Sequence, residues 1–127
     1  MTAEQKIKWI ILALMAEWEE KPIEVQVTAD NIDDLYDEVE DKWDAISETR
    51  AGQFETKLPC QHSRHYESKA VAAKAPDGSW VGWTYWYGGG KHAEPEAIDW
   101  MNEAYDLNVT EEEKMVTVRT FAKMGAA

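Results

Sequence analysis

The sequence predicts an α+β fold, a single compact domain in which three helices pack on an antiparallel or mixed sheet of about four strands. Apolar residues recur with helical spacing in two stretches near the N-terminus, residues 3–19 and 30–48. Two strand-like runs, 65–75 and 79–88, flank an Asp-Gly pair that is typical of a β-hairpin. Helices and hairpin-connected strands that occupy separate parts of a 127-residue chain favour one α+β domain.

The first helix is expected over residues 3–19, with Thr2 as its N-cap. Its apolar arc is wide, which indicates central burial, with a second partner surface as the alternative. The arc is formed by Ile7, Ile10, Ile11, Leu14 and Trp18, and is widened by Trp9, Leu12 and Met15. Pro22 ends the helix, and the alternation of apolar and polar residues over 23–27 predicts a half-buried strand.

The second helix, over residues 30–48, is strongly acidic. Residues 17–48 hold thirteen of the chain's 25 carboxylates and only two lysines. Apolar residues recur with helical spacing within the helix, so the acids are left on its opposite face. The apolar face consists of Ile32, Leu35, Tyr36, Val39, Trp43 and Ile46. The pattern therefore predicts one amphipathic rod with a dense negative stripe.

The hairpin is the clearest local signal in the second half of the chain. A two-residue turn centred on Asp77-Gly78 pairs Ala75 with Trp80 and continues outward along both strands. Small alanines then face large aromatic rings across the ladder, which fixes the register. Because both faces of the run at 79–88 carry aromatic residues, we expect a central or covered strand.

The chain after the hairpin is expected to form a third helix and a last strand. Gly88-Gly89-Gly90 breaks the preceding strand, and Pro95 opens a helix over residues 94–107. The glycine loop, Lys91 and the start of this helix form a candidate anion site, for which a plain structural loop is the alternative. A final strand is expected over 114–121, which is rich in β-branched residues.

The acidic rod is the first candidate for function. Its carboxylates follow one another about every 3 Å along the helix axis, given a rise of ~1.5 Å per residue, and B-DNA presents one phosphate per ~3.4 Å of strand. This spacing resembles the strategy of acidic viral inhibitors that imitate DNA. Like charges four residues apart destabilise such a helix, which indicates that the negative field is used; a solvated face is the alternative. The candidate partner-binding residues are Asp30, Asp33, Asp34, Asp37, Glu38, Asp41, Asp44 and Glu48.

The only cysteine and all three histidines form the second candidate. One thiolate and three imidazoles, from Cys60, His62, His65 and His92, suit a tetrahedral zinc site. The predicted hairpin brings His65 near the glycine loop that carries His92. An enzyme hypothesis uses Cys60 as nucleophile and His62 or His65 as base. Surface histidines in a polar loop are the structural alternative.

Composition restricts the classes of partner. The net charge of −12 opposes direct binding to nucleic acid or to an anionic membrane, and an apolar run of eight residues, 9–16, is too short to cross a bilayer. The lone Cys60 agrees with a cytoplasmic protein. We therefore expect a small non-catalytic binding protein that needs no cofactor. It would inhibit or regulate a basic, nucleic-acid-binding protein or complex as a DNA-mimic or anti-CRISPR-like, phage-encoded factor; the zinc or anion site is the rival. A homodimer through the first helix is compatible with either hypothesis.

Overall fold

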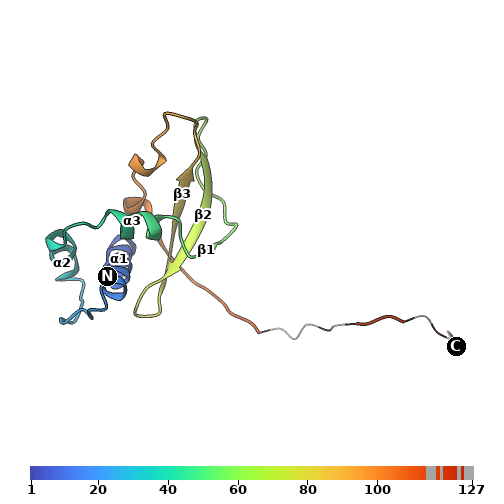
Figure 1. The fold of residues 1–127 in the computed structure, drawn as a ribbon, viewed down its shortest axis with the longest axis horizontal. Coiled ribbons are helices and arrows are strands. Elements are labelled where there is room, and N and C mark those ends of the chain that lie inside the picture. The colour runs from blue at the N-terminus through green and yellow to red at the C-terminus, as the bar shows by residue number, and fades with distance from the viewer. Residues whose placement is uncertain (114–116, 118, 123, 125–127) are drawn as a thin grey trace.

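The computed structural model describes residues 1–113, 117, 119–122 and 124, and shows an α+β architecture (Figure 1). Three helices come first along the chain: α1 (Ala3–Trp18), α2 (Ile32–Glu38) and α3 (Trp43–Arg50). Four strands follow: β1 (Phe54–Glu55), β2 (Glu67–Lys74), β3 (Trp80–Tyr87) and β4 (Tyr105–Leu107). Two 3-10 turns, η1 (Pro95–Ala97) and η2 (Met101–Glu103), connect β3 to β4. The strands form one antiparallel sheet in the order β1-β2-β3-β4, so the predicted fold class is confirmed.

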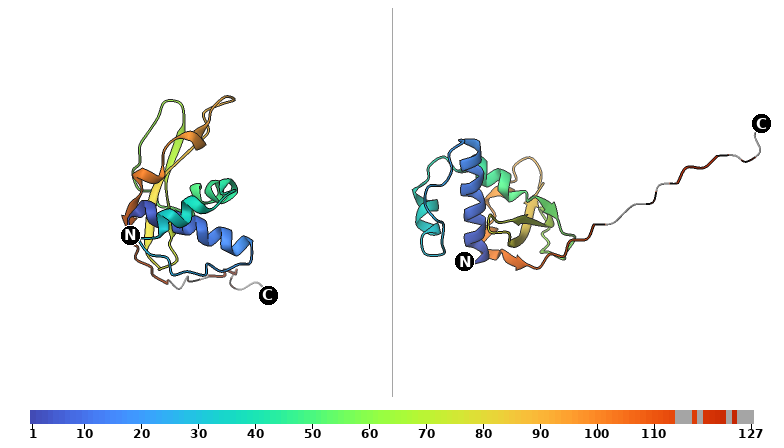
Figure 2. Two further views of the ribbon diagram at one scale, coloured as in Figure 1. Left: turned by 90° about the vertical axis from the view of Figure 1, so that its left-hand side faces the viewer. Right: turned by 90° about the horizontal axis from the view of Figure 1, so that it is seen from below.

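Helix α1 lies between the sheet and α2 (Figures 1 and 2). This position explains its wide apolar arc, and Ile7 and Ile11 are fully buried. Opposite them on the sheet lie Val81 and Trp83 of β3, both also at 0% exposure. Burial of each such side chain stabilises the fold by roughly 1.5–3 kcal/mol.

Among the described residues, no helix combines the length and the apolar character that crossing a bilayer requires.

The start of α1 follows the sequence prediction. Thr2 caps the helix: its hydroxyl accepts the N–H of Gln5 at 3.1 Å, and the Gln5 side chain accepts the N–H of Thr2 at 2.9 Å. Two otherwise unsatisfied amides are thereby paired at the helix end. The expected strand over 23–27 is wrong, because these residues form an irregular connection with a bend at Val25 and have no ladder partners in the described sheet.

The predicted acidic helix over 30–48 is wrong in its continuity, because the chain turns between α2 and α3. Asp41 adopts a left-handed φ of 58°, and Val39 at the end of α2 is extended. Each like-charge pair four residues apart costs a few tenths of a kcal/mol, so a continuous helix here is weakly favoured. The turn lets Lys42 reach back, where its Nζ donates to the Tyr36 carbonyl at 2.7 Å and lies 4.1 Å from the ring centroid.

The hairpin is confirmed, but its predicted register is wrong by one residue. Ala73 lies opposite Val81, and the Ala75 N–H donates to the Ser79 carbonyl at 2.8 Å. The connecting loop thus has three residues, ending at Gly78 with a φ of 90°. A two-residue turn would have required an N–H from Pro76, which proline lacks. A three-residue loop with glycine in the left-handed position avoids that loss.

The predicted third helix over 94–107 is also wrong. The segment instead forms η1, η2 and β4, which pairs with the first half of β3. Tertiary contacts override the local helical pattern here: Trp100 is buried with its ring centroid 5.4 Å from that of Trp83. The strand expected over 114–121 lies partly outside the described residues, and the described ones, 117 and 119–121, are in no strand.

Candidate functional site

The eight predicted partner-binding carboxylates lie on α2, on α3 and in the segments that precede and join these two helices. We call this set the acidic surface; all of its members are exposed. Asp30 precedes α2, Asp41 lies in the turn, and the others are carried by α2 or α3. The members on α2 are Asp33, Asp34, Asp37 and Glu38, and those on α3 are Asp44 and Glu48. Because the turn at Asp41 interrupts the helix, these charges do not follow a single axis at constant spacing.

Asp33 serves the fold. One of its oxygens pairs with Lys8 Nζ at 2.8 Å, and the other accepts the Gln5 side-chain amide at 3.2 Å. The hydrogen bond from Lys8, and then that from Gln5, lowers the pKa of Asp33 below its usual value, and the same bond to Asp33 raises the pKa of Lys8. Asp33 therefore ties α2 to α1, and its assignment as a partner-binding residue is not supported by its contacts.

The other seven acids form no ion pair with any residue that the structure describes. The cation nearest in sequence, Lys42, is turned toward Tyr36 by the hydrogen bond and ring contact described above. The acidic surface therefore carries a negative charge that the rest of the described chain does not neutralise. Such a field attracts basic partners and accelerates their association.

An exposed tryptophan accompanies these acids and was missed by the sequence prediction. Trp43 begins α3 with 64% of its surface exposed, although helical periodicity had placed it on the apolar face. The turn at Asp41 changes the helical phase and releases the ring from the core. Tryptophan is enriched among the residues that dominate protein–protein affinity. In the sequence, the two charged neighbours of Trp43, Lys42 and Asp44, are the signal that could have indicated its exposure. The exposure itself follows only from the turn at Asp41.

The Cys60 and histidine residues do not form the predicted zinc site. All four lie in the described part of the chain, where no group of three or more His, Cys, Asp or Glu side chains is placed to hold a metal. Cys60 Sγ instead lies 3.7 Å from Ser68 Oγ. The expected proximity of His65 to the glycine loop is present, because a Cβ on Gly89 would meet the His65 carbonyl at 2.9 Å. That contact involves backbone and does not assemble ligands.

The glycine loop has a structural explanation. Gly88, Gly89 and Gly90 all have φ between 71° and 94°, a region that other residues rarely adopt. Gly89 also packs against Tyr66, whose Cδ1 lies 2.8 Å from the position of an added Cβ. The helix expected to supply an anion-binding N-terminus is only the 3-10 turn η1. The candidate anion site thus lacks the helix on which it was based.

The chain has no match among protein-family models, curated proteins or solved structures.

Proposed function

We propose that this chain is a small non-catalytic binding protein that uses its acidic surface to engage a basic surface on another protein. The observation that carries the proposal is the combination of seven exposed acids that form no ion pair with a described residue and the exposed ring of Trp43. The acids supply long-range attraction, and the ring supplies an apolar anchor that excludes water at the contact.

Proteins that bind nucleic acid are the class of partner that this surface fits best. Their binding sites are lined with lysine and arginine that neutralise phosphates, and the exposed carboxylates of α2, the turn and α3 offer those residues an alternative anion. An inhibitor or regulator of such a protein, of the DNA-mimic or anti-CRISPR type, follows from this chemistry. Because the chain turns at Asp41 and the regular spacing of one rod is lost, the total charge of α2 and α3 and the ring of Trp43 would attract and hold the partner.

Affinity capture from the native host with mass spectrometry tests the proposal. The test variant neutralises four acids of α2, the turn and α3, and a matched control neutralises four exposed acids near η1 and η2. Both variants change the net charge by the same amount. The test variant carries Asp34→Asn, Asp37→Asn, Asp41→Asn and Asp44→Asn. The control carries Glu94→Gln, Glu96→Gln, Asp99→Asn and Glu103→Gln.

We expect a basic, nucleic-acid-binding protein to be retained by the wild type and by the control, and to be lost by the test variant. Retention should also decrease between 50 mM and 500 mM salt, because exposed charges are screened over about 10 Å at 0.1 M ionic strength. Equal loss of the partner from both variants would show that the interaction depends on net charge alone and not on the acidic surface. Equal retention of the partner by both variants would show that the acidic surface does not bind it.

A further inference from the structure

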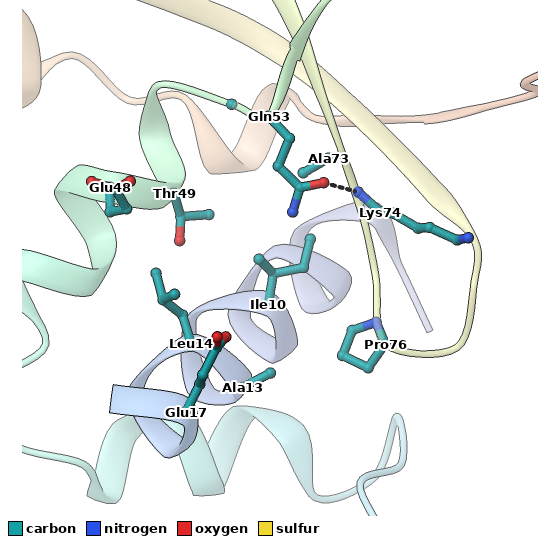
Figure 3. Close-up of a pocket in the computed structure, with 11 residues that line it drawn as sticks. Ile10, Ala13, Leu14, Glu17, Glu48, Thr49, Gln53, Ala73, Lys74 and Pro76 are labelled. Carbon is teal, nitrogen blue, oxygen red and sulfur yellow. Dashed lines mark hydrogen bonds between the residues drawn. The ribbon is translucent and has the colours of Figure 1, made fainter. Parts of the chain in front are cut away.

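A cavity of about 300 Å³ opens between α1, α3 and the β2–β3 hairpin (Figure 3). Its apolar walls come from Ile10, Ala13 and Leu14 of α1 and from Pro76 of the hairpin. The size is at the lower end for ligand sites, so it suits one side chain or a fragment rather than a cofactor. The function proposed above does not use this cavity.

A buried hydroxyl without a partner lies at the cavity. Thr49 is 6% exposed, and its Oγ1 has no hydrogen-bond partner among the residues that the structure describes. Figure 3 shows this oxygen pointing toward the side chains of Ile10 and Leu14. Leaving a buried hydroxyl unsatisfied is unfavourable, and such groups in native proteins call for an explanation. This oxygen has less than 1 Å² of accessible surface, so a polar group can bind to it only if a neighbouring side chain, such as the partly buried Leu14, moves.

The entrance to the cavity is acidic. Glu17 of α1 and Glu48 of α3 line it from two sides, and neither forms an ion pair with a described residue. Lys74 also lines the cavity, but its side chain runs sideways, so its ammonium points away from the other side chains drawn (Figure 3). A basic group at this cavity therefore has two exposed carboxylates and aliphatic walls beside it, with the hydroxyl of Thr49 buried behind them.

The rim adds a fixed donor. Gln53 accepts the N–H of Lys74 with its amide oxygen at 3.1 Å, which orients the side chain. Its amide nitrogen faces the cavity (Figure 3). A donor at the rim can bind a backbone carbonyl, which a peptide offers and a simple amine lacks.

We propose that this cavity is a socket for one lysine side chain of the basic partner, with its ammonium bonded to Thr49 Oγ1 between Glu17 and Glu48. The aliphatic stem lies against Ile10 and Leu14, as lysine stems do on apolar surfaces. A single hydroxyl acceptor matches the compact ammonium of lysine better than the planar fork of arginine. The socket rests on the proposed function, because Glu48 belongs to the acidic surface and the partner supplies the lysine.

The socket can be tested without the partner by NMR titration of the methyl-labelled full chain with Nα-acetyl-lysine N-methylamide. We expect saturable shifts of the Ile10, Leu14 and Thr49 methyls, with a dissociation constant on the order of 1 mM for so small a ligand. The norleucine analogue lacks the ammonium and should bind about tenfold more weakly. The arginine analogue and n-butylamine should also bind more weakly. Absence of these shifts, or equal binding of the norleucine analogue, would overturn the socket.

Three variants separate the socket from general electrostatics. Thr49→Val keeps the shape of the side chain but removes the acceptor. It should weaken binding of the lysine probe about tenfold. Ala13→Leu fills the cavity from a different residue and should abolish the methyl shifts, which keeps the test informative if the first variant misfolds. Glu94→Gln removes an exposed acid that does not line the cavity and should leave binding unchanged. Loss of binding in Glu94→Gln comparable to that in Thr49→Val would refute the assignment.

Failure of the socket and failure of the proposed function give different results. The four-Asn test variant leaves every cavity-lining residue in place, so it should bind the lysine probe with at most a modest loss. Probe binding together with no captured partner would refute the proposed function and keep the socket. A captured partner whose affinity is the same for the wild type and for Thr49→Val would refute the socket and keep the proposed function.

Discussion

Replacing Thr49 by valine should stabilise the protein, which is unusual for a change at a buried site. Valine is close to threonine in shape, and the two have similar helix propensities, so α3 is little perturbed. The hydroxyl it replaces is buried without a partner, among apolar neighbours that include Ile10 and Leu14. An unsatisfied buried hydroxyl costs about 1–3 kcal/mol. Removing it should raise the free energy of unfolding by about that amount.

The gain corresponds to a measurable change in melting temperature. An unfolding entropy of ~2.1 cal/mol/K per residue gives a chain of this length a shift of roughly 4 °C for each kcal/mol. The melting temperature should therefore rise by about 4–11 °C. In urea, the midpoint should rise while the slope of the unfolding free energy stays constant. Far-UV circular dichroism and tryptophan fluorescence provide two independent probes of the same transition.

Thr56 supplies a matched control with the opposite expectation. Its hydroxyl donates to the Ala70 carbonyl at 3.3 Å and accepts the Leu58 N–H at 3.2 Å. Thr56→Val should therefore lower the free energy of unfolding by about 1 kcal/mol. A decrease in stability for Thr49→Val, or equal changes in the two variants, would show that the Thr49 hydroxyl has a partner in solution and would refute the reasoning.

Three further predictions concern the sheet. Gly82→Val should lower the free energy of unfolding by about 1–3 kcal/mol and expose β4 to hydrogen exchange, because a Cβ at this position would lie 2.7 Å from Tyr105 Cε2. Hydrogen bonds from the Ser79 hydroxyl and backbone lower the pKa of Asp77, so its carboxylate stabilises the hairpin above the unfolded pKa of about 3.9. The stability difference between wild type and Asp77→Asn in urea should therefore shrink as the pH falls from 7 to below 3. Trp83→Phe removes an indole N–H that donates to a carbonyl of α3 at 2.8 Å, and should cost about 1–3 kcal/mol by thermal unfolding, with the far-UV spectrum kept.

Local signals in the sequence predicted those elements whose contacts are local. The capping box at Thr2 and the periodicity of α1 are satisfied within one helix, and the Asp-Gly pair locates the hairpin. The register failed because Pro76 changes which residues can close the turn. The prediction of a helix over 94–107 failed because the helical pattern competes with pairing to β3. That pairing depends on the open space beside Gly82. Contacts of that kind are invisible to a local pattern.

The candidate site was predictable in its charge but not in its shape. The count of carboxylates identifies the acidic segment, and their exposure follows from the apolar positions between them. The left-handed turn at Asp41 depends on tertiary packing of α2 and α3 against different parts of α1, so neither the break nor the exposure of Trp43 could be read from periodicity. The role of Asp33 likewise required Lys8, twenty-five positions earlier, to be placed beside it.

The role of the acidic surface is tested most directly by the dissociation constant of the captured partner, measured by isothermal titration calorimetry for four proteins. These are the wild type, Trp43→Ala, the four-Asn variant and its charge-matched control. We predict a loss of about 30-fold for Trp43→Ala, a loss of at least about tenfold with a weaker salt dependence for the four-Asn variant, and wild-type affinity for the control. Equal affinities for all four proteins would contradict the assignment of α2 and α3 as the binding surface.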